Sequence, residues 1–201
     1  FEWLLFKTKK KIYFDFDDAI FHKYDLSTNY IVKLFLSRKI EFLMRNSQGT
    51  IAGNEYIKKY AEDSGCKNIL NMPTVIDINN YVSHPPDYIS RTRFVIGWIG
   101  SPSTSKYLEI LAEPLAEIGL KIPVLLYIVG ADPNFDLLIP NIEIRLTPWS
   151  EKVEQNALRD FDVGVMPLYD NSWERGKCAF KLIQYMASFL LNVYLIIFQF
   201  L

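Results

Sequence analysis

The sequence predicts an α/β fold, a Rossmann-like three-layer arrangement around a parallel sheet. Apolar segments of strand length alternate with segments of helical periodicity along most of the chain. Several of the apolar segments show no polar alternation, which is typical of strands buried on both faces of a parallel sheet. The chain has 201 residues, of which 50% are hydrophobic and 22% charged. This is a globular composition, large enough for one domain or for parts of two.

The first part of the chain is expected to form one partial sheet with its helices. The expected elements are a strand at 12–16, a helix at 28–45, a strand at 50–53, a helix at 55–64 and a strand at 68–72. In the first helix, Ile31, Leu34 and Phe35 follow helical spacing. Asn54 is a suitable N-cap for the second, because its side chain can accept from a first-turn N–H. We assign residues 1–76 to this domain.

Residues 77–92 are rich in Asp, Asn, Pro and Ser and predict a linker. A second domain is expected over residues 93–188. Its expected elements are strands at 94–99, 124–129, 142–146 and 161–167, and helices at 103–118, 150–159 and 178–188.

Charge and cysteine content exclude several classes of protein. The net charge is −1 and the isoelectric point about 6.2, whereas general nucleic-acid binders are usually strongly basic. Cys66 and Cys178 lie far apart without ligand spacing, so neither a disulfide framework nor a zinc site is indicated. The composition fits a reducing cytosol, and we expect no nucleic-acid partner.

The end of the chain is unusual, because residues 182–201 contain no charge. Twenty uncharged residues are long enough for a membrane-spanning helix, yet Gln184, Asn192 and Gln199 interrupt the run. We interpret residues 189–201 as an aberrant apolar tail left by truncation or a frame shift. A real membrane segment is the alternative.

The most informative stretch runs from Asp162 to Ser188. An apolar strand leads into a loop with charge and glycine, and the loop opens an amphipathic helix. The unpaired N–H groups and the positive end of a helix favour anions. Here the basic and glycine residues gather at that end, which predicts a site for a polyphosphate or a nucleotide-sugar diphosphate: Arg175, Gly176, Lys177 and Lys181.

Four segments, in order, resemble family 4 (group 1) glycosyltransferases of the GT-B fold. They are Tyr13-Phe-Asp-Phe-Asp-Asp-Ala-Ile-Phe21, Ile51-Ala-Gly-Asn-Glu-Tyr56, Ile96-Gly-Trp-Ile-Gly-Ser-Pro102, and Asp162 through Ser188. The resemblance covers roughly residues 10 to 188 and implies two Rossmann-like domains with a cleft between them. It places residues 1–76 in the acceptor-side domain and 93–188 in the donor-side domain, both truncated.

The resemblance also implies which residues bind the donor. In this family the loop after the first donor-domain strand contacts the diphosphate through a glycine, an Arg and a later Lys. These positions are Gly100, Ser101 and Lys106, so the Arg is replaced. The family's pair of glutamates falls on Gly176 and Gln184, and the second of the pair grips the donor ribose. Gln184 can still hydrogen-bond a hydroxyl, and Glu174 can replace the first acid from a shifted position.

Asp15, Asp17 and Asp18 stand at or just after a strand end, where ligands bind in open α/β sheets. Three interpretations remain open: a site for Mg²⁺ or Mn²⁺, an acceptor-side polar wall or base formed by Asp17 and Asp18, and helix capping. GT-B enzymes generally need no metal, so no metal or cofactor is expected. Trp98, Trp149 and Trp173 are expected to be packing residues, although Trp173 adjoins the donor loop and can also cover a base or sugar ring.

Together these features predict a hexosyltransferase-class enzyme, retaining and metal-independent, that moves a sugar from a nucleotide diphosphate to an acceptor hydroxyl. The acceptor is a saccharide, a lipid-linked sugar or a small alcohol, and a role in polysaccharide biosynthesis is the family habit. The expected location is the cytoplasm, with peripheral association at the inner membrane face. Because both domains are expected to be cut, we expect this chain to be inactive alone. The alternative is a non-enzymatic nucleotide-binding or regulatory module.

Overall fold

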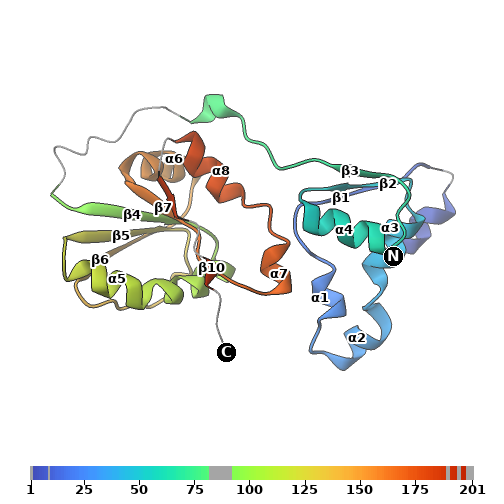
Figure 1. Ribbon diagram of the computed structural model, residues 1–201, viewed down its shortest axis with the longest axis horizontal. Coiled ribbons are helices and arrows are strands. Elements are labelled where there is room, and N and C mark those ends of the chain that lie inside the picture. Colours follow the sequence, from blue (N-terminus) through green and yellow to red (C-terminus); the bar gives the residue numbers. More distant parts are fainter. Residues whose placement is uncertain (1, 9, 82–91, 189–190, 194–195, 198–201) are drawn as a thin grey trace. The chain divides into compact units, whose positions relative to one another are not determined.

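The computed structural model describes residues 2–8, 10–81, 92–188, 191–193 and 196–197, which form two compact units (Figure 1). The first unit comprises Phe1–Thr74 and Asp170–Cys178, and the second comprises Val75–Tyr169 and Ala179–Leu201. In sequence, the segment 170–178 lies between two parts of the second unit, yet it belongs to the first. Each unit is described by itself below.

The first unit is built on a parallel sheet in the order β1-β2-β3. Its strands are Tyr13–Phe16, Gly49–Ala52 and Ile69–Asn71. Its helices are η1 Glu2–Lys7, α1 His22–Asp25, α2 Tyr30–Leu36, α3 Lys39–Asn46, α4 Glu55–Asp63 and α7 Ser172–Arg175. The Asn54 side chain accepts from the backbone N–H of Ile57 at 2.9 Å, so the expected N-cap of α4 is confirmed.

The single helix expected at 28–45 is wrong, because the chain forms α2 and α3 instead. The apolar side chains of α2 are exposed, Phe35 by 75%, whereas α3 buries Ile40, Leu43 and Met44. The two apolar stripes are out of phase: continuing the stripe of Ile31 by two turns reaches Arg38. One straight helix cannot turn both stripes toward one core, and the break after Leu36 lets α3 face the sheet on its own.

The second unit contains a five-stranded parallel sheet in the order β6-β5-β4-β7-β9. The strands are β4 Phe94–Ile99, β5 Val124–Val129, β6 Ile142–Thr147, β7 Val163–Val165 and β9 Leu191–Val193. The helices are η2 Ile78–Asn80, η3 Pro102–Leu111, α5 Ala112–Gly119, α6 Glu151–Asp160 and α8 Phe180–Ala187. A short parallel pair joins β8 Leu168–Tyr169 to β10 Ile196–Ile197. The predicted α/β class with parallel sheets is confirmed.

This unit has the three layers that the sequence predicts. Figure 1 shows α5 on one side of the sheet and α6 and α8 on the other. Glycines allow the close packing on the α6 side: a Cβ at Gly97 would stand 2.0 Å from the Phe161 ring, and one at Gly164 would stand 2.4 Å from the Tyr185 ring. Phe161 and Tyr185 are both fully buried, and their rings fill the space that side chains at Gly97 and Gly164 would otherwise occupy.

Two segments of the second unit differ from expectation, and proline contributes to both differences. The helix expected at 103–118 is a 3-10 helix followed by α5. Pro114 has no N–H to continue an α-helical ladder from the preceding turn, so the α-helix begins only at Ala112. The strand expected at 161–167 is confined to β7, because Phe161 still caps the end of α6 and Pro167 cannot donate to a neighbouring strand. In the linker, residues 82–91 lie outside the described residues.

The apolar tail at 189–201 is partly described. Leu191–Val193 pairs in parallel with β7, with Leu191 opposite Val163 and Val193 opposite Val165. This segment therefore adds the next strand to the sheet, as a βαβ unit requires after α8. Residues 189–190, 194–195 and 198–201 lie outside the described residues. Among the described residues, no helix is long and apolar enough to cross a membrane.

Candidate functional site

Three loops meet at the carboxyl edge of the second unit's sheet. The Gly100 N–H donates to the Val129 carbonyl, and the Gly130 N–H donates to the Thr147 carbonyl, both at 2.9 Å. Gly130 has φ +80°, and a Cβ there would stand 2.4 Å from the Gly100 oxygen. The turn therefore requires glycine for its conformation and for its fit. Ligands of open α/β sheets bind at such carboxyl ends.

Trp98 joins two residues that the sequence assigns to the donor site. Its indole is 1% exposed, and a Cβ at Gly100 would stand 2.0 Å from the ring. The Lys181 ammonium lies 4.9 Å from the centroid of the same ring, at cation–π distance. Gly100 and Lys181 are therefore brought to one indole, although they are far apart in the sequence. Trp98 packs in the interior, as expected, and also supports this edge.

Lys181 stands in the first turn of α8, which has no acidic residue. Ala179, just before the helix, has φ 54° and ψ 33°, the left-handed conformation that L residues other than Asn and Asp seldom adopt. The end of a helix that carries a cation and no carboxylate has a positive potential, because the helix dipole adds to the charge. The start of α8 is thus electrostatically suited to an anion.

Gln184 is buried, and its side chain is engaged within the unit. Its Nε2 donates to the Tyr81 hydroxyl at 3.0 Å and to Glu154 Oε1 at 2.9 Å. The other carboxylate oxygen of Glu154 accepts from the Trp149 indole N–H at 2.7 Å. The sequence did not single out Glu154 or Tyr81. The signal that could have found Glu154 is its place in the first turn of the helix that follows the strand at 142–146, near the expected ligand edge.

Ser101 and Lys106 occupy the loop and helix after β4, and both are exposed. Ser101 Oγ lies 3.1 Å from Ser103 Oγ. The Lys106 ammonium lies 5.3 Å from the ring centroid of the adjacent Tyr107. These contacts are local to η3, whereas Lys181 lies against Trp98 of another element.

The basic and acidic residues of the segment 170–178 belong to the first unit. Arg175 forms a two-pronged ion pair with Asp170, Nε to Oδ1 at 2.7 Å and Nη2 to Oδ2 at 2.9 Å. This hydrogen bonding lowers the pKa of the Asp170 carboxyl. The Gly176 carbonyl accepts from Asn54 Nδ2 at 2.9 Å, and a Cβ at Gly176 would stand 2.1 Å from Ala19 Cβ. Gly176 is therefore needed for close packing on the first unit.

The two candidate acids of the acceptor side lie beside this segment. Burial raises the pKa of the Asp18 carboxyl, Lys177 opposes that rise, and Asp17 and Glu174 add to it. Glu174 is buried, and its Oε2 lies 3.4 Å from the Lys177 ammonium. Asp17, Asp18, Glu174 and Lys177 thus form one charged cluster within the first unit. The predicted residues divide between this cluster and the carboxyl edge of the second unit.

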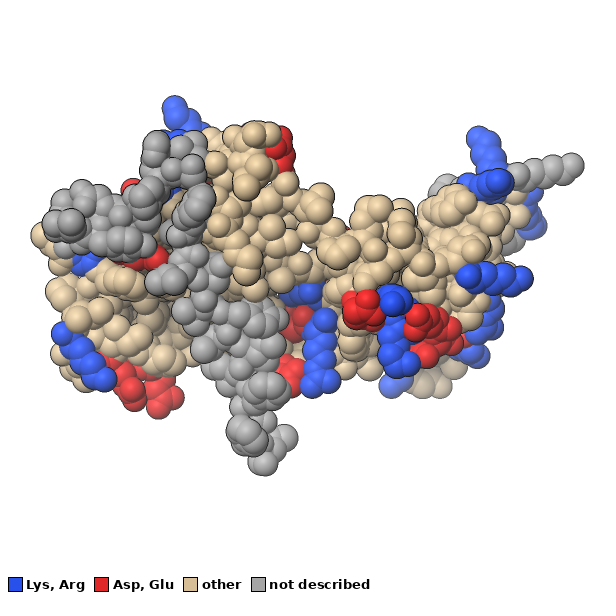
Figure 2. Space-filling model, turned by 45° about the horizontal axis from the view of Figure 1, so that its top comes forward, with Lys and Arg blue, Asp and Glu red and all other residues tan. Residues whose placement is uncertain are grey.

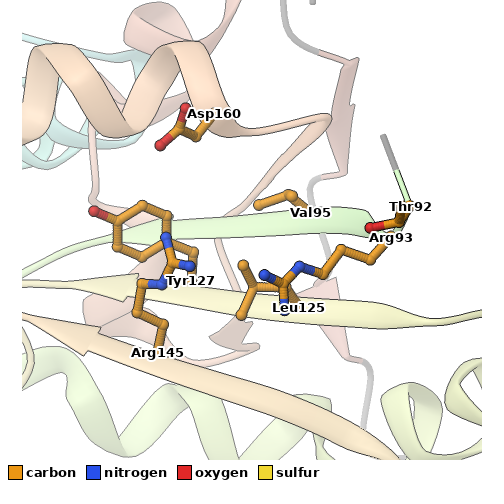
Figure 3. Close-up of a pocket in the computed structure, with 7 residues that line it drawn as sticks. All are labelled: Thr92, Arg93, Val95, Leu125, Tyr127, Arg145 and Asp160. Atoms are coloured by element: carbon orange, nitrogen blue, oxygen red, sulfur yellow. The ribbon is translucent and has the colours of Figure 1, made fainter. Parts of the chain in front are cut away.

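A shallow cavity of about 310 Å³ lies on the α6 face of the second sheet (Figure 3). The Arg145 guanidinium lies 5.1 Å from the Tyr127 ring centroid, and Arg93 pairs with Glu143. Val95 and Leu125 line it from the second positions of β4 and β5, away from the edge at Gly100. With Asp160 in its wall, the cavity carries charges of both signs.

On the face drawn in Figure 2, the described residues form no patch of a single charge sign that could steer a polyanion. Figure 2 shows acidic and basic side chains interspersed on the face in view, in keeping with the net charge of −1. Among the described residues, no group of three or more His, Cys, Asp or Glu side chains is placed to hold a metal ion.

Comparison with known proteins identifies relatives by structure only. No protein-family model and no curated protein matches the sequence. The fold is similar to that of TarM, with a TM-score of 0.65, 17% identity, and coverage of 94% of this chain and 38% of the TarM chain. It is also similar to that of a point mutant of S. aureus TarM in complex with fondaparinux, alpha-GlcNAc-glycerol and UDP. For this mutant the TM-score is 0.61 and the identity 16%, and the match covers 96% of this chain and 39% of the mutant's chain. At this identity the likeness shows the fold alone, and the chain spans less than half of each relative.

Proposed function

We propose that this chain is part of a glycosyltransferase that moves a sugar from a nucleoside diphosphate to an acceptor hydroxyl. The observation that carries the proposal is the pairing of Gly100 and Lys181 on the Trp98 indole, at the carboxyl edge of a parallel sheet. The structural relative is named with UDP and alpha-GlcNAc-glycerol. UDP and a glycoside are what remains after transfer of GlcNAc from UDP-GlcNAc.

The proposed site supplies positive potential to the leaving group. During transfer the bond from the sugar C1 to the β-phosphate oxygen breaks, and a bond from C1 to the acceptor oxygen forms. Negative charge then develops on the diphosphate, and the proton of the acceptor hydroxyl passes to the departing diphosphate oxygen or to a carboxylate base. Lys181 and the amino end of α8 stabilise that charge, and Gly100 lets the backbone approach the phosphates. In this proposal the exposed side chains of Ser101 and Lys106 also contact the diphosphate. The transfer is proposed to retain the configuration at C1 and to need no metal.

The charged cluster of the first unit is proposed to serve the acceptor. Asp17 and Asp18 present carboxylates that can accept from sugar hydroxyls, and the raised pKa of Asp18 suits a group that takes up a proton. In this proposal the segment 170–178 is held beside these two acids by four of its own residues: Glu174, Arg175, Gly176 and Lys177. We propose a saccharide acceptor, since fondaparinux is the saccharide named with the structural relative.

Titration of the chain with UDP, GDP and ADP by calorimetry tests the donor site. We expect binding of at least one nucleotide, and we expect Lys181→Ala to weaken it by about 1.5–3 kcal/mol, the range for a hydrogen bond to a charged group. Lys121→Ala is the matched control, because Lys121 is exposed and precedes β5 at the opposite edge of the sheet. Equal affinities for wild type and Lys181→Ala would remove Lys181 from the site.

A second assay separates an enzyme from a nucleotide-binding module, the alternative that the missing glutamate pair favours. Release of nucleotide from UDP-, GDP- and ADP-sugars is followed with and without saccharide acceptors. Acceptor-dependent release that Lys181→Ala abolishes supports transfer. Tight nucleotide binding with no release, in a chain extended to the full length of its gene, supports the module.

A further inference from the structure

Glu154 places a carboxylate next to Gln184, whose own side chain is neutral. Both hydrogens of the Gln184 amide are engaged, by Glu154 Oε1 at 2.9 Å and by the Tyr81 hydroxyl at 3.0 Å. The amide nitrogen therefore has no hydrogen left for a ligand. Gln184 is 3% exposed, so its role in this unit is to hold Glu154 and Tyr81.

The Glu154 carboxylate has a fixed position and spare acceptor capacity. Trp149 and Gln184 donate to opposite oxygens, at 2.7 and 2.9 Å, which fixes the plane of the group. A carboxylate accepts about four hydrogen bonds, so sites remain on both oxygens. Glu154 is only partly buried and stands in the first turn of α6, which begins after the Ser150 N-cap.

This carboxylate lies at the same edge as the proposed phosphate contacts. A Cβ at Gly130 would meet both the Gly100 oxygen at 2.4 Å and Trp149 Cβ at 3.0 Å, so the loops after β4, β5 and β6 converge there. Trp149, which the sequence predicts to be a packing residue, is 56% exposed. Its indole offers an apolar face beside a fixed anion. A nucleoside has the complementary features, a flat base and a vicinal diol with two O–H donors.

We propose that Glu154 binds the ribose diol of the donor nucleotide, held in place by Trp149 and Gln184. The inference rests on the proposed function and deepens it, because it selects ribonucleotides over deoxyribonucleotides. It also assigns to α6 a contact that the sequence resemblance places on α8. Trp149 and Gln184 are positioning residues, and Glu154 is the group that touches the ligand.

The test compares UDP with 2′-deoxy-UDP in calorimetric titrations of isosteric variants. We expect Glu154→Gln to weaken UDP binding about 10- to 100-fold, the loss of one charge-assisted hydrogen bond. It should also reduce the preference for UDP over 2′-deoxy-UDP.

Glu151→Gln is the matched control. Glu151 lies in the same first turn of α6 and is exposed, so this variant removes the same helix-end charge and should leave UDP binding unchanged.

Circular dichroism and thermal unfolding verify that each variant is folded. Equal UDP affinity in wild type and Glu154→Gln, or an equal preference over 2′-deoxy-UDP, overturns the inference. If Lys181→Ala still weakens UDP binding, the proposed function survives that result. If wild type binds GDP or ADP but no UDP, the same comparison is made with that nucleotide and its 2′-deoxy form. If wild type binds none of UDP, GDP and ADP, both proposals fail.

Discussion

Gly100→Ala tests the contact that organises the carboxyl edge. A Cβ at this position would stand 2.0 Å from the Trp98 ring, whereas ordinary contact begins at 3.4 Å. The ring or the loop must therefore move by about 1.4 Å, the difference between these distances. Trp98 is 1% exposed, so the movement repacks the interior. Overpacking of this kind costs typically about 1–3 kcal/mol.

The displacement also changes the proposed phosphate site. The Lys181 ammonium lies over the same ring, so a tilt of the indole moves the cation away from the Gly100 loop. We expect the variant to unfold at a lower temperature, by about 2–4 °C for each kcal/mol lost in a chain of this size. We also expect weaker UDP binding.

Near-ultraviolet circular dichroism during thermal unfolding reports on the packing of the indole, and calorimetry reports on UDP. Lys121→Ala is the control, because Lys121 is exposed and precedes β5 at the opposite edge of the sheet, away from the indole. A Gly100→Ala chain with wild-type melting temperature, near-ultraviolet spectrum and UDP affinity would refute the reasoning.

Two further predictions concern buried polar groups. Tyr185→Phe removes the hydroxyl that accepts from the Ile99 N–H at 3.2 Å in a fully buried site. We expect the free energy of unfolding, measured in urea, to fall by about 1–3 kcal/mol. The control Tyr13→Phe, at an exposed ring, should change it by no more than about 0.5 kcal/mol. Asp18 has a pKa raised by burial, so folding favours its protonated form. That contribution is fully present below the unfolded pKa of about 3.9 and is lost as the pH rises through the folded pKa. Asp18→Asn should therefore raise the melting temperature at neutral pH and leave it unchanged well below the unfolded pKa; a stabilisation equal at both values would show that the charge is not the cause.

The fold class followed from features that are local in the sequence. Unbroken apolar runs such as Val124–Val129 predict strands buried on both faces, and every residue of this strand is buried. Asn54 and Ser150 cap the helices that follow them. The errors have local causes that pattern reading underweights. The apolar stripe of α2 is out of phase with that of α3, and Pro114 delays the start of α5.

The site was predicted in part, because its contacts join distant segments. Gly100 and Lys181 were both expected near a diphosphate, and Trp98 brings them together. Periodicity could not reveal that Gln184 would be buried and would hold Glu154 across two helices. Nor could it reveal that the segment 170–178 packs on the first unit through Gly176 and Ala19. Such pairings depend on tertiary structure, which one sequence does not encode as a visible pattern.

Hydrogen–deuterium exchange of the chain with and without UDP locates the proposed donor site most directly. We predict slower exchange in the loops at 100–106 and 147–154 and in the first turn of α8, with the Lys181→Ala variant showing less protection at the same UDP concentration. Protection confined to the strand segments at 93–95, 125–127 and 143–145 would place the nucleotide in the cavity of Figure 3 instead. That result would contradict the assignment of the carboxyl edge as the donor site.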